Sequence, residues 1–154
     1  MVKLIMVMIN RKSSGQSLVE VVVTLAIASL VVVALVFGAT IGIRNVQFSR
    51  NQSRAMELNR EASEWLRVEK RISWSQLWSK GSDGEGTTYC FSGLNFNKKR
   101  GCYSDELIDS KFTREGVLKQ LGSEDDKLEI TITTNWEDAS GDHNETITTY
   151  LTKY

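Results

Sequence analysis

The chain has 154 residues, which is enough for one compact domain and a long additional helix but too few for two full domains. Its 19 basic and 19 acidic residues cancel, yet residues 1–15 hold three of the basic residues and no acid. The remainder therefore has an acidic excess. Because charge-driven binding of nucleic acid needs clustered lysine and arginine, this balance argues against a direct nucleic-acid site.

Residues 1–15 form a basic leader that ends in Arg11-Lys12-Ser13-Ser14-Gly15. The apolar run at residues 4–9 is too short to cross a bilayer. Positive charges that flank a membrane-spanning helix stay on the cytoplasmic side. Arg11 and Lys12 therefore predict a cytoplasmic N-terminus and an outward-facing remainder.

Residues 16–43 are predicted to form a membrane-spanning helix, because residues 18–43 are almost entirely apolar. Thr24, Ser29 and Thr40 interrupt the run at little cost, since their hydroxyls can bond to backbone carbonyls one turn back. Glu20 is different. A carboxylate at bilayer depth costs on the order of 2.5–3.5 kcal/mol, and such residues usually have a functional partner. The alternative is that Glu20 merely reaches the lipid headgroups.

Residues 44–80 are predicted to continue this helix as an amphipathic segment, since no Gly or Pro interrupts them. Apolar side chains recur there at three- and four-residue spacing, which is typical of a helix with one buried face. This apolar stripe comprises Ala55, Leu58, Ala62, Trp65 and Ile72, widened by Leu66 and Val68. It requires a covering surface elsewhere in the chain.

Residues 81–154 are predicted to form a β-rich globular part that supplies this surface. Strand-forming residues lie at 88–94, 101–104, 111–121, 128–136 and 146–150, with a break or bulge expected at Gly116 and a turn over 137–144. In the fourth of these segments, Leu128, Ile130 and Ile132 alternate with polar residues, which indicates a strand with one buried face. The predicted fold class is α+β, with a long N-terminal helix packed on a small antiparallel sheet.

Cys90 and Cys102 lie in the part that is expected to face outward, where a disulfide is favoured over two free thiols. There is no Cys-x-x-Cys or Cys/His cluster for zinc, and the acidic clusters lack the spacing of a calcium loop. The sole histidine, His143, falls in the predicted turn without a nucleophile motif. We therefore expect no catalytic residue, no metal and no cofactor, with a calcium site in an acidic loop as the less favoured alternative to a solvated turn.

Residues 15–25, which read Gly-Gln-Ser-Leu-Val-Glu-Val-Val-Val-Thr-Leu, resemble the class III signal of type IV pilins and pseudopilins. The resemblance implies that a prepilin peptidase cuts between Gly15 and Gln16 and methylates the new N-terminus at Gln16. It also makes Glu20 the fifth mature residue, where the family has a glutamate that meets the freed amine of a neighbouring subunit during filament assembly. A buried charge becomes tolerable when it is paired in this way.

Two features depart from the family pattern. The mature chain would begin with Gln16, whereas members often begin with phenylalanine. Many major pilins have a helix-kinking proline, and this chain has none. We expect the region of Gly38 and Gly42 to replace it as a softer segment, although a Gly-x-x-x-Gly pair can instead let two helices approach closely.

The resemblance implies a subunit of a type IV pilus or pseudopilus, not an enzyme. The C-terminal hairpin at 128–136 and 146–154 resembles that of some minor pilins, so a minor subunit is expected. The implied partners are other pilin subunits in a helical filament, the prepilin peptidase and the membrane assembly machinery. The implied location is the cytoplasmic (inner) membrane, crossed once, and then the extracellular filament. Adhesion, motility, DNA uptake and secretion remain open as roles.

A rival interpretation is a secreted or membrane-anchored extracellular binding domain with an ordinary signal peptide, cut near residues 36–38. The apolar run is longer than such a signal needs, and Glu20 would then be unexplained. A singly anchored enzyme is a third interpretation, but the sequence offers no active site for it.

Overall fold

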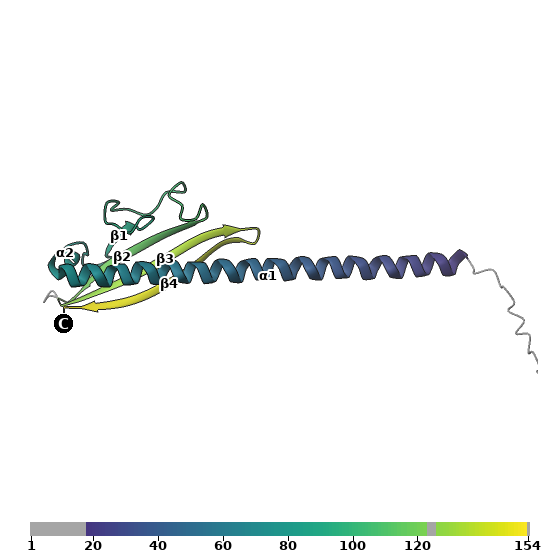
Figure 1. The fold of residues 1–154 in the computed structure, drawn as a ribbon, viewed down its shortest axis with the longest axis horizontal. Coiled ribbons are helices and arrows are strands. Elements are labelled where there is room, and N and C mark those ends of the chain that lie inside the picture. The colour runs from purple at the N-terminus through teal and green to yellow at the C-terminus, as the bar shows by residue number, and fades with distance from the viewer. Residues whose placement is uncertain (1–17, 123–125, 154) are drawn as a thin grey trace, which may run out of the picture. The chain divides into compact units, whose positions relative to one another are not determined.

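The structure is a computed structural model that describes residues 18–122 and 126–153. Its elements are α1 (Leu18–Ile72), α2 (Trp74–Trp78), β1 (Thr87–Cys90), β2 (Phe112–Leu121), β3 (Lys127–Asp138) and β4 (Gly141–Thr152) (Figure 1). A long N-terminal helix and an antiparallel sheet confirm the predicted α+β class. The chain divides into two compact units, residues 1–44 and residues 45–154.

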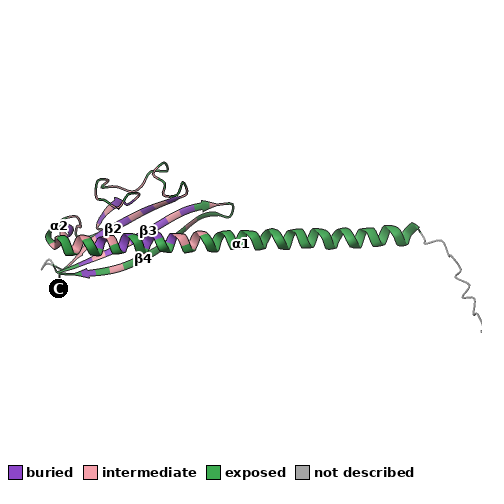
Figure 2. Cartoon of the chain, viewed as in Figure 1, coloured by how far each residue is buried: buried purple, intermediate pink, exposed green. Residues whose placement is uncertain are grey.

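The described part of the first unit is the N-terminal portion of α1. Every residue from 18 to 44 is helical and exposed (Figure 2). The hydroxyls of Thr24, Ser29 and Thr40 donate to backbone carbonyls three or four residues earlier, at 2.8–2.9 Å. Gly38 and Gly42 are helical as well, and apart from their chain neighbours and the adjacent helix backbone no atom lies within 4 Å of the position a Cβ would occupy. The structure therefore has regular helix where a softer segment was expected.

The second unit contains a four-stranded antiparallel sheet in the order β1-β2-β3-β4. Buried and partly buried residues alternate along β3, which confirms the predicted buried face. The predicted turn at 137–144 was too long, since β3 runs to Asp138 and β4 begins at Gly141. Residues such as Asp142 and Asn144 are polar because they lie at exposed positions of an outer strand.

The C-terminal portion of α1 packs on this sheet. Ala55, Leu58, Ala62 and Leu66 are at most 1% exposed, and Ala62 and Leu66 share a core cluster with apolar residues of β2 and β3. Burying such a helix face stabilises the unit, at about 25 cal/mol for each Å² of apolar surface removed from water. Ile72 was wrongly assigned to the buried stripe, because it is 70% exposed.

The predicted helix over 44–80 is in fact two helices. Residue Ser73 has an extended backbone (φ −159°, ψ 105°), and its hydroxyl accepts a hydrogen bond from the Gln76 backbone N–H at the start of α2. Serine is a preferred N-cap because it satisfies an otherwise unpaired N–H group of the first helical turn. The five-residue α2 then buries Leu77 in the same core.

Gly116 lies in a regular ladder instead of the bulge that was expected. It pairs with Tyr89 on β1 and with Ile132 on β3. A Cβ at this position would lie 2.0 Å from Cε2 of Phe91. The glycine is therefore explained by the aromatic ring that lies over the strand, since any larger residue would displace it. Of the strands expected at 88–94 and 101–104, the first is shorter than predicted and ends at Cys90 as β1. The second is absent from the described residues, because residues 91–111 form a loop.

Candidate functional site

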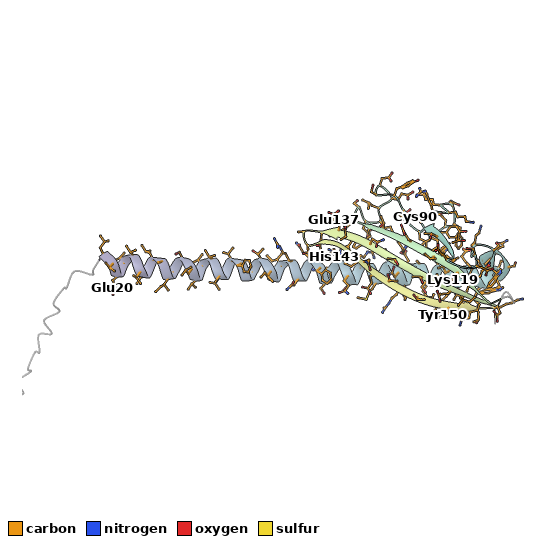
Figure 3. The ribbon with its side chains drawn as sticks, turned by 180° about the vertical axis from the view of Figure 1, so that it is seen from behind. Glu20, Cys90, Lys119, Glu137, His143 and Tyr150 are labelled. Carbon is orange, nitrogen blue, oxygen red and sulfur yellow. A yellow bond between two sulfur atoms is a disulfide. The ribbon has the colours of Figure 1, made fainter. Side chains whose placement is uncertain are left out.

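Glu20 lies in the first turn of α1 and is exposed (Figure 3). The N–H groups at the start of a helix have no intrahelical partner, and the helix dipole there favours a negative charge by roughly 0.3–1 kcal/mol. The bond predicted to be cut, between Gly15 and Gln16, lies outside the described residues. The structure therefore describes the carboxylate but not the amine that is expected to pair with it.

Apolar side chains surround the first unit of α1. At least fifteen large hydrophobic residues between Leu18 and Ile43 are more than 40% exposed. Within the described residues, α1 is the helix whose length and hydropathy suffice to cross a membrane. Monomeric soluble proteins rarely expose a contiguous apolar surface of this kind. It must be covered by lipid or by other helices.

A polar network joins α1 to β3 and β4 in the second unit. Asn59 is 1% exposed, and its side-chain oxygen accepts a hydrogen bond of 2.7 Å from the hydroxyl of Thr134. Its side-chain N–H group donates to the backbone carbonyl of Glu145 at 2.9 Å. Because a buried amide without partners is costly, this pair of bonds fixes the helix in one register on the sheet.

A buried arginine joins the other side of the helix to the loop after β1. Arg114 is 2% exposed. Its guanidinium donates to the carbonyl of Leu58 at 2.6 Å and to the carboxylate of Glu61 at 2.9 Å. Two further N–H groups donate to the carbonyl of Phe91, at 3.0 and 3.1 Å. Burial lowers the pKa of Arg114, and the pairing with Glu61 acts in the opposite direction.

The loop at 91–111 is held by covalent and ionic contacts. Cys90 and Cys102 form a disulfide with an S–S distance of 2.05 Å, as their location in the part expected to face outward favoured. Hydrogen bonds from Arg100, Lys98 and the backbone N–H of Tyr103 hold the pKa of Glu106 well below its usual range. The loop is therefore fixed at several points between its ends.

His143 lies on β4, and its contacts are those of a residue that secures the β3–β4 hairpin. Its Nε2 lies 3.0 Å from a carboxylate oxygen of Asp138, and its ring packs against Trp136 and Phe48. A backbone hydrogen bond from Ser140, and then the contact with His143, lower the pKa of Asp138. The structure thus gives this histidine a packing role.

The buried polar residues Arg114, Asn59 and Thr134 were not singled out from the sequence. The two-residue period of a strand could have identified Arg114, because it lies on the same buried face of β2 as Phe112, Gly116 and Leu118. Asn59 gave a weaker signal, since it adjoins Leu58 on the apolar stripe. No local pattern marks its partner Thr134 among the many threonines of β3 and β4.

One comparison with known families gives a match. A family model described as the prokaryotic N-terminal methylation motif matches residues 10–36. These residues include Gly15, Gln16 and Glu20 and the first part of the apolar stretch. No curated protein and no solved structure matches the chain. The match confirms the predicted class III signal, while the sheet unit has no counterpart among these comparisons.

Proposed function

We propose that the chain is a filament subunit of the type IV pilin and pseudopilin kind, held in the membrane until it is assembled. The methylation motif at residues 10–36 supports this proposal. The observation that carries the proposal is the apolar portion of α1. It is exposed along its whole length and holds one carboxylate, Glu20, in its first turn. Both lipid and a bundle of like helices can cover such a surface.

The proposed processing follows from the same motif. The prepilin peptidase cuts after Gly15, and Gln16 becomes the methylated first residue. Glu20 of one subunit then pairs with the freed amine of the next. A paired buried charge is tolerated where a lone one costs several kcal/mol, so the contact sets the axial register between subunits.

The proposed topology has the N-terminus in the cytoplasm and the second unit outside. Arg11 and Lys12 support it through the positive-inside rule. The Cys90–Cys102 disulfide supports it as well, since such bonds persist in oxidising compartments. The β3–β4 hairpin supports a minor subunit through its resemblance to some minor pilins.

The mature N-terminus tests this proposal. The protein should be purified from the membrane and from sheared filaments of the cells that make it, and its intact mass and N-terminal sequence determined. We expect a chain that begins at Gln16 and carries one added methyl group. A chain that begins near Ala39, or one that retains Met1, would contradict the proposal. A Gly15→Val variant, which blocks the cut in the motif, serves as the control and should retain Met1 and stay out of filaments.

A further inference from the structure

Two charged surfaces lie at opposite ends of β4. The first is the acidic hairpin, formed by Glu137 on β3 and Asp142 on β4. The second is the basic groove, a hollow of about 500 Å³ lined by Glu64, Arg67, Lys70 and Arg71 of α1 and by residues 150–152 of β4. Figure 3 shows Glu137 at one end of the sheet and Tyr150 at the other.

The acidic hairpin holds like charges that the fold itself does not neutralise. Glu137 and Asp142 are direct cross-strand partners, and both are exposed. Like charges directly opposite one another destabilise a sheet. Neither carboxylate forms an ion pair among the described residues. Glu137 and Asp142 line a hollow of about 650 Å³ together with Lys111, and one lysine against two carboxylates leaves a negative excess.

The basic groove has the opposite imbalance. It has three basic side chains against the single carboxylate of Glu64. That carboxylate forms an ion pair with Arg67, at 3.8 Å. Lys70 and Arg71 have no ion-pair partner in the described parts of the chain. The last turn of a helix favours basic residues through its dipole. That effect accounts for Lys70 and Arg71, but not for a groove that also contains Arg67.

The acidic hairpin and the basic groove are separated by most of the length of β4. From Asp142 to Leu151 the strand advances nine residues, about 30 Å at the rise of an antiparallel strand. One molecule therefore cannot bring its own hairpin to its own groove. A second copy, displaced along the strand by about that distance, places its acidic hairpin at the groove of the first. Contacts of this head-to-tail kind can join successive copies along a filament, and two adjacent copies are enough to form one such contact.

We propose that the occupant of the basic groove is the acidic hairpin of a second copy of this chain, with Glu137 and Asp142 of one copy meeting Lys70 and Arg71 of the next. This contact rests on the proposed filament function and adds to it a specific surface outside the apolar helix. It requires at least two adjacent copies in the filament. The opposite charges favour the correct axial displacement, because a wrong one places like charges together.

Cross-linking within wild-type filaments tests the contact directly. Sheared filaments should be treated with a carbodiimide, which joins an amine to a carboxylate without a spacer, and the peptides identified by mass spectrometry. We expect a peptide that joins Lys70 to Glu137 or Asp142. The same treatment of the detergent-solubilised monomer should not give it, because the two ends are too far apart. Filaments in which Lys70 is joined only to a different protein would overturn the proposal of a second copy.

Charge exchange tests whether the contact matters for assembly. Lys70→Glu with Arg71→Glu, and separately Glu137→Lys with Asp142→Lys, should each reduce the amount of protein in filaments by about tenfold, as expected when a few partly exposed ion pairs become repulsive. A chain with all four substitutions should recover assembly, since its two surfaces match again. The matched control is Lys99→Glu with Asp83→Lys, which reverses two exposed charges outside both surfaces.

The outcomes separate this contact from the broader proposal. Double variants that assemble like the wild type, or a fourfold variant as defective as either double, would overturn the contact while leaving the filament function intact. Absence of the wild-type protein from every filament would instead contradict the proposed function. Thermal unfolding of each variant should match that of the wild type, which excludes misfolding as the cause of a loss.

Discussion

Replacing the buried Arg114 by methionine should lower the free energy of unfolding of the second unit by about 3 kcal/mol. Methionine has an unbranched chain that can fill much of the space but has no donor for the four hydrogen bonds of the guanidinium. The carbonyl of Phe91 loses both donors that Arg114 provides, and a buried carbonyl without a partner costs about 1–3 kcal/mol. Losing the hydrogen bonds donated by the charged guanidinium adds about 1.5–3 kcal/mol to this cost. The variant no longer buries a charge, and this gain offsets part of the total loss of stability.

The assay is urea unfolding of the full chain in detergent, followed by tryptophan fluorescence. All four tryptophans lie in the second unit, so the signal reports that unit. The unfolding midpoint should fall while the slope stays constant. The control is Arg60→Met, which changes an exposed arginine of α1, the helix that Arg114 contacts, and should stay within about 0.5 kcal/mol of the wild type. If Arg114→Met has the same urea midpoint as the control, the hydrogen bonds of Arg114 to α1 and to the loop after β1 do not stabilise the fold.

Three further predictions concern the sheet, the hairpin and the apolar helix. Gly116→Ala should lower the free energy of unfolding by about 1–3 kcal/mol in the same assay, because its methyl group must displace the ring of Phe91. Because the pKa of Asp138 is lowered in the folded state, its contribution to stability is present above the unfolded pKa, near 4, and is lost as the pH falls through the folded value. Unfolding measured between pH 7 and pH 2 should therefore show a smaller acid dependence for Asp138→Asn than for the wild type. Glu20→Val should enter the membrane as the wild type does but should be absent from sheared filaments, as judged by immunoblot of the two fractions.

Each of these predictions has a matched control and an outcome that contradicts it. Gly116→Ala in a Phe91→Ala background adds the same methyl group with no ring to displace, and an equal stability loss in both backgrounds would dismiss the steric argument. Asp83→Asn removes an exposed carboxylate elsewhere. If it changes the acid dependence of unfolding as much as Asp138→Asn does, the contacts of Asp138 do not account for that dependence. Thr24→Val changes another polar residue of the apolar stretch. Normal filament entry by Glu20→Val would mean that Glu20 only reaches the headgroups.

The features that depend on local pattern could be predicted from the amino-acid sequence alone. The apolar stretch, the position of Glu20 and the glycine before Gln16 were sufficient to predict the class III signal, and the family match at residues 10–36 confirms it. Strict alternation over residues 128–132 predicted β3 and its buried face. These predictions succeed because period, length and motif spacing act over neighbouring residues and need no knowledge of distant ones.

The features that depend on packing between distant segments could be seen only in the folded structure. An arginine and an asparagine are buried because α1 and the sheet bring carbonyls within reach of their donors. Gly116 is fixed by an aromatic ring that belongs to a distant segment of the chain. Ile72 is exposed because α1 ends at this residue, and the following helix α2 buries Leu77 in the core instead. Each outcome depends on groups far apart in sequence, whose proximity no local periodicity can indicate.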